Sequence, residues 1–264
     1  MKIATYNLRF GGIGARIHWR KMFEAIAPEI FLVQESYAPN EYMSAQFCQL
    51  NQDRLLWSKA GTNKWGSALF VKNGQVKPIE IPDFAGWVVG AEVTQFNWLE
   101  KTQQRSRVFS IHASTTNKSS YIGEVNSILD FIASFTDDCD LIIGGDFNFT
   151  VGIRHEHEEL KNSQQELKLL NRIQREFGLI NCWQAANPNR FLPQTLRWSG
   201  NKSIPYHCDG IFVPATWYPY LRSCDVLASK DWELLSDHNP VVANFESDTT
   251  KDIKTTAVST FNHA

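Results

Sequence analysis

The sequence predicts an α/β fold, because short apolar runs typical of buried strands alternate with segments whose apolar residues recur at helical spacing. The chain has 264 residues, 43% hydrophobic and 20% charged, which is typical of a globular protein with a sizeable core. This length suits one large α/β or sandwich domain, or two small ones. We find no low-complexity linker between two cores, so we expect one domain over 1–246 and a polar, disordered tail over 247–264.

The first half of the chain reads as strands around two helices. Strands are expected at 2–8, 30–33, 67–71, 76–81, 87–96 and 107–112, and helices at 19–27 and 42–50. Pro28 ends the first helix, and Asn73-Gly74 is expected to form a hairpin turn between the third and fourth strands.

The second half carries two amphipathic helices, at 121–135 and 167–177, and Gly178 suits the C-terminal end of the latter. Strands are expected at 141–143, 209–213, 223–227 and 241–245, a loop or lid at 154–162, and a loop at 192–205.

The net charge is −2, so the chain has no global basic signature. Any contact with nucleic acid must then come from a local patch, and a metal ion could supply further positive charge. The five cysteines are scattered, with no C-x-x-C pair, which argues against a disulfide framework and a structural zinc site. We find no secretion signal and no apolar stretch long enough to span a bilayer. We therefore expect a cytoplasmic monomer.

The strand at 141–143 leads into two glycines, where the backbone must turn or let a ligand approach closely. Asp146 and Asn148 follow two residues apart, so an extended backbone would point both to one side. A carboxylate and a carboxamide there could take a proton and hold an oxyanion or a phosphate. Alternatively, they are ordinary turn residues.

Other expected strands also begin or end in polar groups: Asn7, Glu35, His112, Asp209, Asp237 and His238. Each alone could be a loop acid, a turn residue or a core histidine with satisfied hydrogen bonds. Strand ends gather at one rim of a sheet, however, so chance placement of the whole set is much less favoured. The set therefore indicates a catalytic site.

These residues lie in motifs that resemble those of the endonuclease/exonuclease/phosphatase family, which includes deoxyribonuclease I, exonuclease III-type repair enzymes, inositol polyphosphate 5-phosphatases and bacterial sphingomyelinases. The motifs are Thr5-Tyr6-Asn7-Leu8-Arg9, Gln34-Glu35, Ile111-His112-Ala113-Ser114, Gly145-Asp146-Phe147-Asn148, Asp209-Gly210-Ile211-Phe212-Val213 and Ser236-Asp237-His238-Asn239-Pro240. They cover the chain to about residue 246 in the family's order. The resemblance implies a four-layer α/β sandwich: two mixed sheets packed face to face, with helices outside.

The resemblance also implies a hard divalent cation, Mg²⁺ or Mn²⁺, which oxygen ligands suit. Glu35 would be the main metal ligand, with Asn7 and Asp237 helping to hold the metal or the scissile phosphate.

By the same resemblance, Asp146 would deprotonate the attacking water, and Asn148 would hydrogen-bond the transition-state oxygens. His238, held by Asp209, would act as a charged donor or general acid, although models with the histidine as base also exist within the family. His112 would bind phosphate or share in proton transfer.

One departure concerns His112. In secreted deoxyribonucleases the corresponding histidine is supported by an acidic residue of a nearby strand. Here that region reads Lys64-Trp65-Gly66-Ser67-Ala68 and offers no acid. A role for His112 as a catalytic acid is therefore in question.

At the rim, Arg9 follows the first strand, where the resemblance would place it on a phosphate. Lys64-Trp65 and Arg197-Trp198 each pair a cation with an indole, which suits contact with a nucleic-acid backbone and base. Core or rim packing is nevertheless the favoured explanation of the indoles, because the chain has 9 Trp. The 155–159 segment could hold a second metal or form a solvated acidic loop.

The leading hypothesis is a metal-dependent phosphodiesterase, most favourably a nuclease acting on DNA. The alternatives are a phosphatase or phosphodiesterase acting on a small molecule or lipid headgroup, and a non-catalytic binding module. The near-neutral charge keeps the phosphatase alternative open, because duplex-binding proteins usually carry a basic stripe.

Overall fold

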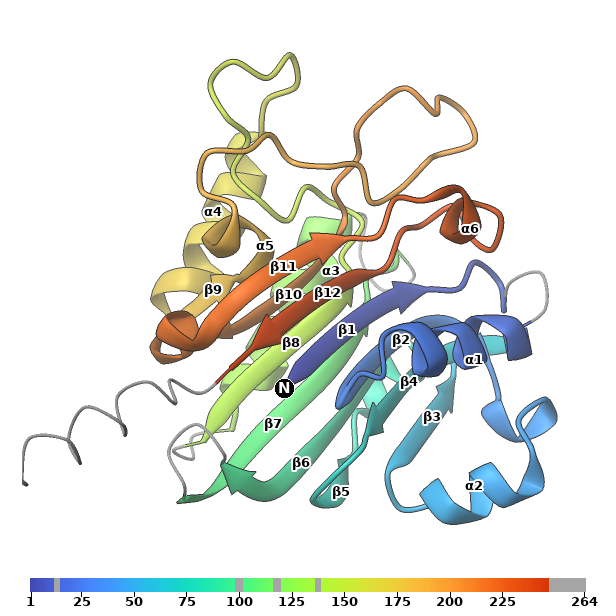
Figure 1. The fold of residues 1–264 in the computed structure, drawn as a ribbon. Coiled ribbons are helices and arrows are strands. Elements are labelled where there is room, and N and C mark those ends of the chain that lie inside the picture. Colours follow the sequence, from blue (N-terminus) through green and yellow to red (C-terminus); the bar gives the residue numbers. More distant parts are fainter. Residues whose placement is uncertain (12–14, 98–101, 116–119, 136–138, 247–264) are drawn as a thin grey trace, which may run out of the picture.

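The computed structural model describes residues 1–11, 15–97, 102–115, 120–135 and 139–246 (Figure 1). Two six-stranded sheets pack face to face, and helices lie on their outer faces. The expected four-layer α/β sandwich is therefore confirmed. The expected tail lies outside the described residues.

The first sheet has the order β11-β12-β1-β2-β4-β3. Its strands are β1 (Lys2–Asn7), β2 (Ile30–Tyr37), β3 (Leu55–Lys59), β4 (Trp65–Val71), β11 (Leu221–Val226) and β12 (Val241–Phe245). β1 and β2 run parallel, and the other neighbours are antiparallel. The parallel pair places the ends of β1 and β2 at the same edge.

The second sheet has the order β5-β6-β7-β8-β10-β9. Its strands are β5 (Gln75–Ile79), β6 (Val88–Asn97), β7 (Thr102–His112), β8 (Asp140–Asp146), β9 (Leu179–Asn181) and β10 (Asp209–Pro214). β7 and β8 run parallel, while β10 runs antiparallel to β8. The end of β8 therefore lies beside the start of β10.

The α-helices are α1 (Ala15–Ala25), α2 (Ala45–Asn51), α3 (Tyr121–Ala133), α4 (Gln164–Arg175), α5 (Cys182–Ala186) and α6 (Lys230–Glu233), with 3₁₀ turns at Pro39–Glu41, Pro82–Phe84 and Ala215–Tyr220. α4 begins with a capping box. The Ser163 hydroxyl accepts the Glu166 backbone N–H, and the Glu166 carboxylate accepts the Ser163 backbone N–H. Gly178 follows α4 with φ +64°, which a glycine adopts without steric cost.

Three apolar cores hold the layers together. One lies between the sheets and includes Leu32, Val108 and Ile142. The second joins β7, β8 and β10 to α3 and α4, and the third joins β1, β2 and β4 to α1 and Trp232. The sheets therefore pack both on each other and on their helices, which fixes the relative position of the strand ends.

The expected hairpin at Asn73-Gly74 is wrong. β4 pairs with β2 and β3 in the first sheet, whereas β5 pairs with β6 in the second. The chain therefore crosses from one sheet to the other at this turn, because the inner faces of both sheets need apolar partners. β3 was not expected from the sequence, because it is an edge strand whose side chains are only half-buried for most of its length.

The described cysteines form no disulfide. Among the described helices, none is both long enough and apolar enough to cross a membrane.

Candidate active site

The topology gathers the polar strand ends between the two sheets. Asn7 ends β1, and Glu35 lies near the end of the parallel strand β2. In the second sheet, His112 and Asp146 end the parallel strands β7 and β8 and are partners in the register, while Asp209 starts β10 opposite Asp146. The Asn7 side-chain amide donates to Oδ2 of Asp146 at 2.9 Å, which joins the two sheets at this point.

Glu35 is held by its own strand and by the loop after β1. The register of β2 against β4 shifts between Val33 and Ser36, and Glu35 has φ +52°. Its Oε2 accepts the Phe10 backbone N–H at 2.6 Å, and its carbonyl accepts that of Gly11 at 2.6 Å. Oε1 lies 3.2 Å from the Asn7 amide nitrogen and 3.5 Å from His112 Nε2. One carboxylate oxygen therefore faces the site.

Asp146 is 1% exposed. Its Oδ1 accepts the backbone N–H of Asn148 at 3.0 Å. Asn148 has φ +53°, a conformation that asparagine tolerates better than most residues, and its side-chain amide donates to the Ala113 carbonyl at 3.0 Å. Burial raises the pKa of Asp146 despite the nearby histidines, because the charged carboxylate is poorly solvated there.

His238 and Asp209 form the predicted pair. His238 Nδ1 lies 2.9 Å from Asp209 Oδ2 and 3.1 Å from Oδ1, and His238 Nε2 lies 3.8 Å from Asp146 Oδ2. Burial disfavours the imidazolium, but the carboxylates of Asp209 and Asp146 outweigh it and raise the pKa of His238 to about 10. This pKa favours the cationic side chain, whose Nδ1 faces Asp209 and whose Nε2 faces Asp146.

His112 is buried between two indoles. Its ring lies 5.6 Å from that of Trp65 and 5.3 Å from that of Trp87, measured between centroids. Nε2 lies 3.9 Å from Asp146 Oδ2. Nδ1 has no hydrogen-bond partner among the described residues. Aromatic rings therefore flank this histidine where a supporting acid would otherwise stand.

Asp237 lies at the edge of the cluster. Its Oδ2 pairs with Arg9 Nε at 3.2 Å, and its Oδ1 is buried without a hydrogen-bond partner in the described part of the chain. Its carbonyl accepts the Arg197 backbone N–H at 2.8 Å. Arg9, with φ +53° and a half-exposed side chain, therefore reaches across from the end of β1 to the loop before β12.

The remaining predicted rim residues are Arg197, Trp198 and Lys64. The Arg197 guanidinium donates to Asn239 Oδ1 at 2.5 Å and to the Ser236 carbonyl at 2.6 Å, so it holds the loop that carries His238. Trp198 is 50% exposed and lies edge-on to Tyr206, and Lys64 is exposed.

Hydroxyl groups that the sequence analysis did not single out position this cluster. Ser236 Oγ donates to the Asn7 carbonyl at 2.8 Å and accepts the His238 N–H at 3.1 Å. Thr195 Oγ accepts the N–H groups of Cys208 and Asp209. Ser236 opens the Ser-Asp-His motif, so its position could have indicated the role, whereas nothing in the sequence around Thr195 points to Asp209.

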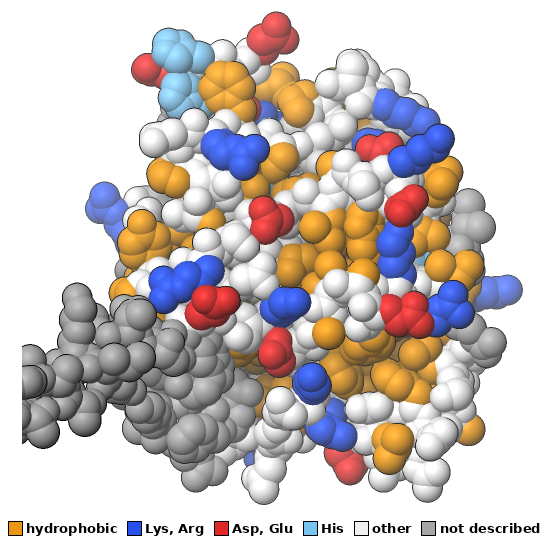
Figure 2. Space-filling model, in the orientation of Figure 1, with side chains coloured by type: hydrophobic (Ala, Val, Ile, Leu, Met, Phe, Trp, Pro, Cys, Tyr) orange, Lys and Arg blue, Asp and Glu red, His pale blue; other side chains and the backbone are white. Residues whose placement is uncertain are grey.

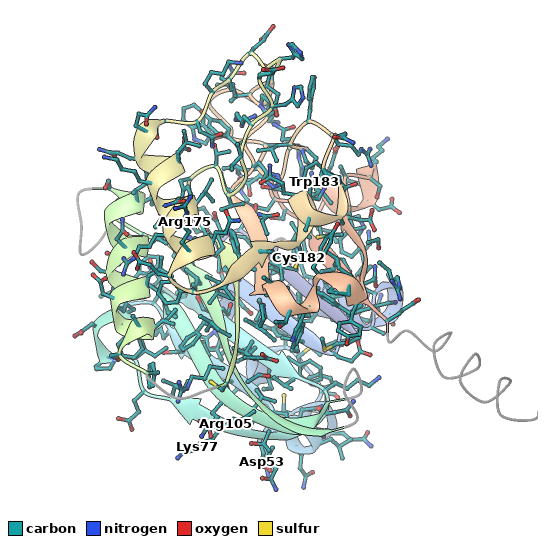
Figure 3. All side chains as sticks on the ribbon, turned by 90° about the vertical axis from the view of Figure 1, so that its left-hand side faces the viewer. Asp53, Lys77, Arg105, Arg175, Cys182 and Trp183 are labelled. Carbon is teal, nitrogen blue, oxygen red and sulfur yellow. The ribbon has the colours of Figure 1, made fainter. Side chains whose placement is uncertain are left out.

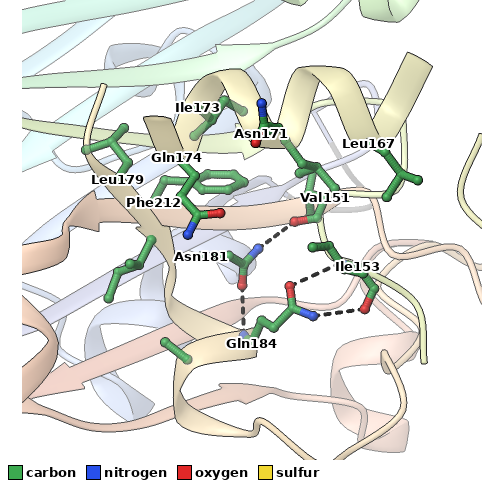
Figure 4. Close-up of a pocket in the computed structure, with 13 residues that line it drawn as sticks. Val151, Ile153, Leu167, Asn171, Ile173, Gln174, Leu179, Asn181, Gln184 and Phe212 are labelled. Atoms are coloured by element: carbon green, nitrogen blue, oxygen red, sulfur yellow. Dashed lines mark hydrogen bonds between the residues drawn. The ribbon is translucent and has the colours of Figure 1, made fainter. Parts of the chain in front are cut away.

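The segment after Asn148 is fixed by amide side chains at the apolar hollow between α4 and α5 (Figure 4). Asn181 donates to the Val151 carbonyl at 2.6 Å, and Gln184 exchanges two hydrogen bonds with the backbone of Ile153. These bonds hold the segment that leads away from the active-site strand β8.

The 155–159 loop is built around an ion pair. Glu158 is buried and lies 2.7 Å from Arg154 Nη1, and it also accepts the His155 backbone N–H. The arginine further donates to the Pro205 carbonyl. These contacts are those of a structural loop, and they occupy the buried carboxylate that a second metal would need.

The donor set fits a hard divalent cation. Such ions take oxygen ligands, one or two of them carboxylates, and complete their shell with water and substrate oxygens. Glu35 Oε1 faces the cluster, and Asp237 Oδ1 is a buried acceptor with no donor among the described residues. Asp146, Asp209 and His238 also lie close enough to share an ion, although His238 Nδ1 is already bonded to Asp209.

No protein-family model matches the chain, and no curated protein matches it in sequence. Solved structures do resemble it. An AP endonuclease from Archaeoglobus fulgidus is 18% identical with a TM-score of 0.70, covering 93% of this chain and 99% of that one. The 3′ phosphatase NExo from Neisseria, solved with a product DNA hairpin, is 18% identical with a TM-score of 0.63, covering 93% and 99%. The endonuclease domain of TRAS1, a telomere-specific non-LTR retrotransposon, is 16% identical with a TM-score of 0.58, covering 94% and 99%.

The fold and these likenesses define a deoxyribonuclease I-like α/β sandwich, the fold of the endonuclease/exonuclease/phosphatase proteins. The fold expected from the sequence motifs is thus confirmed along almost the whole chain.

Proposed function

We propose that the protein is a metal-dependent phosphodiesterase that hydrolyses nucleic acid, with DNA the favoured substrate. The observation that carries this proposal is the buried hydrogen-bonded series that joins Glu35, Asn7 and Asp146, with His238 and Asp209 beside it. Carboxylates and a cationic imidazole around one small space suit the attack of water on an anionic phosphate.

The divalent cation, Mg²⁺ or Mn²⁺, would be held by Glu35 with help from Asn7 and Asp237. It would neutralise charge on the phosphate and on the leaving oxygen, which water alone stabilises poorly. Glu35 is suited to this role because its second oxygen and its carbonyl are fixed by backbone N–H groups. Its other oxygen, Oε1, is therefore preorganised.

The residues of this chain would divide the remaining work. Asp146 accepts the proton of the attacking water, and Asn148 hydrogen-bonds the phosphate oxygens as charge builds on them. His238 donates from Nε2 to the phosphate, because its Nδ1–H is bonded to Asp209. His112 contributes a further donor beside Glu35.

The rim residues take different roles in this proposal. Arg9 and Lys64 contact phosphates of the substrate, and Trp198 offers an exposed face to a base. Arg197 instead positions the His238 loop, because its guanidinium bonds Asn239 and Ser236.

The nuclease proposal is supported by neighbours whose names describe an AP endonuclease, a 3′ phosphatase with a DNA hairpin and an endonuclease domain. A phosphatase acting on a small molecule or lipid headgroup remains the second candidate. The net charge of −2 and the pairing of Arg9 with Asp237 favour it, since few cations are left for remote phosphates.

One substrate panel separates these functions. Pure protein is incubated with plasmid, single-stranded DNA, RNA, inositol phosphates and p-nitrophenyl esters, each with Mg²⁺, Mn²⁺ or EDTA. Cleavage of polynucleotide that EDTA and Asp146→Asn both abolish supports the proposal. Turnover of inositol phosphates with intact polynucleotides would establish the phosphatase instead, and no turnover of any substrate would leave a binding module.

A further inference from the structure

A row of aromatic side chains leads from the active-site cluster to solvent. We define the aromatic rim as Phe10, Trp65, Trp87 and His112. The ring centroids of Phe10 and Trp65 are 5.9 Å apart, those of Trp65 and Trp87 are 5.4 Å apart, and both indoles contact His112. His112 is buried, the indoles are half-buried, and Phe10 is 59% exposed. The exposed end of the row lies next to Glu35, because the Phe10 backbone N–H donates to Glu35 Oε2.

Phe10 is held in this exposed position against its backbone preference. It has φ +53°, which is rare for a bulky residue, and Arg9 before it has the same value. The conformation is fixed by the Phe10 N–H bonded to Glu35 Oε2 and by the Gly11 N–H bonded to the Glu35 carbonyl. Strain of this kind concentrates at functional sites. The loop that secures the proposed metal ligand therefore also presents an aromatic face to solvent.

A lone exposed aromatic needs no explanation, but this one is continuous with a histidine of the active site. The flat apolar group closest to a scissile phosphate in a polynucleotide is the base of an adjoining nucleotide. Stacking on aromatic side chains accepts any base, because every base has a π-face. Lys64 is exposed and directly precedes Trp65 in the chain.

We propose that Phe10 and Trp65 form a stacking platform for an unpaired base next to the scissile phosphate. A base inside a duplex hides its faces in the stack, so the platform selects single-stranded nucleic acid or a strand end. Trp87 and His112 support the platform from within. This inference rests on the proposed function, since it specifies the substrate class of the same site.

The test measures whether Phe10 recognises the base itself. Two oligonucleotides of equal length are compared, one of ordinary DNA and one with the same sugar-phosphate backbone but no bases. Their binding is measured by fluorescence anisotropy with Ca²⁺ in place of Mg²⁺. Stacking of one base changes affinity by between about fivefold and about a hundredfold, so the wild type should prefer the strand with bases by at least about fivefold.

Four variants sharpen the comparison. Phe10→Ala should remove the preference, Phe10→Leu should lose most of it because it keeps bulk but not a flat face, and Phe10→Tyr should retain it. The matched control is Tyr218→Ala. Tyr218 is 56% exposed and lies in the turn that follows β10, whereas Asp209 lies at the start of that strand. This variant should therefore bind as the wild type does.

An unchanged preference in Phe10→Ala, or no preference in the wild type, would overturn the inference. Hydrolysis of the ordinary strand with Mg²⁺ is measured separately. Hydrolysis without a base preference means that the proposed function stands and the platform fails. A base preference that depends on Phe10, without hydrolysis, means that the platform stands and the nuclease proposal fails.

Discussion

Asn7 is the residue through which the two sheets share one site. Its amide nitrogen donates to Glu35 in its own sheet and to Asp146 in the other, and its Oδ1 accepts the Arg9 N–H. These partners fix its orientation, and the carboxylates of Glu35 and Asp146 both accept from its one amide group. Single-atom changes at the carboxylates should therefore be the most informative.

Glu35→Gln removes the charge that would hold the cation while keeping an acceptor for the Phe10 N–H. We expect the rate to fall by more than the roughly 10- to 100-fold typical of an outer-shell residue, and Mg²⁺ affinity to weaken. Rates across a Mg²⁺ titration and calorimetric Mg²⁺ binding measure both effects. The matched control is Glu24→Gln, at an exposed residue of α1. Full activity of Glu35→Gln at saturating Mg²⁺ would refute the metal assignment.

Asp209→Asn keeps the shape of the His238 partner but removes its charge. Since the imidazolium then loses its main support, the rate should fall by roughly a hundredfold, as expected for the orienter of a general acid. Single-turnover rates and thermal unfolding measure the change. Asp225→Asn, on the exposed side of β11, serves as the control. If Asp209→Asn and the control turn over equally fast, Asp209 is only a turn residue.

At the scale of elements, the parallel pair β7–β8 carries His112 and Asp146 to one edge. Gly145 lies in this pair with φ +148°, and a Cβ there would overlap the backbone carbonyl of Ile111. The glycine was expected from the sequence to allow a turn or the close approach of a ligand, whereas the structure shows a close approach of two strands.

Gly145→Ala should therefore destabilise the protein by about 3 kcal/mol or more, because backbone must move to relieve the overlap. Gly178→Ala is the matched control, since Gly178 also has positive φ but nothing lies within 4 Å of its would-be Cβ. It should cost about 1–2 kcal/mol. Urea unfolding measures both. Equal losses of unfolding free energy in the two variants would show that the contact with the neighbouring strand adds nothing to the cost of a Cβ at Gly145.

At the scale of the whole molecule, charges of both signs are interspersed. Figure 2 shows basic and acidic side chains alternating over the face it presents. Figure 3 labels Lys77, Asp53 and Arg105 at one end, while the loops next to β8 and β10 lie at the other. A nucleic-acid substrate would therefore be bound by a few cationic side chains at the rim rather than by a broad basic surface.

If the substrate is a polynucleotide, binding should weaken with salt, with a log–log slope approaching about one per phosphate contacted. Lys64→Ala should flatten that slope by up to about one unit, and Arg9→Ala by less, because Arg9 also pairs with Asp237. Arg197→Ala is not a clean test, since it would disturb the His238 loop.

This prediction is checked with a short duplex and a single strand in Ca²⁺ across a salt series. Lys77→Ala, at the opposite end in Figure 3, is the control and should leave the slope unchanged. A shallow salt slope for both the duplex and the single strand, unaffected by Lys64→Ala, would favour the small-molecule phosphatase.

The sequence by itself determined the elements with strong periodicity and the identity of the polar strand ends. Helices α3 and α4 follow from apolar residues at helical spacing, and β8 follows from its apolar run. The motifs also indicated the fold, because their order and spacing resemble those of one family. Local patterns carry this information, since each depends on residues that are close in the chain.

Only the tertiary structure decided which atoms meet. Asn7 and Asp146 are 139 residues apart, and Arg9 and Asp237 join opposite ends of the domain. The same holds for the crossing at Asn73-Gly74, where the local turn signal is real but the strands belong to different sheets. Long-range packing fixes such pairings, because burial of apolar faces in two sheets outweighs the preference of any single turn. Residues that are close in the chain do not reveal that competition, so the sequence did not show that Arg197 holds the His238 loop or that Phe10 lies at an exposed rim.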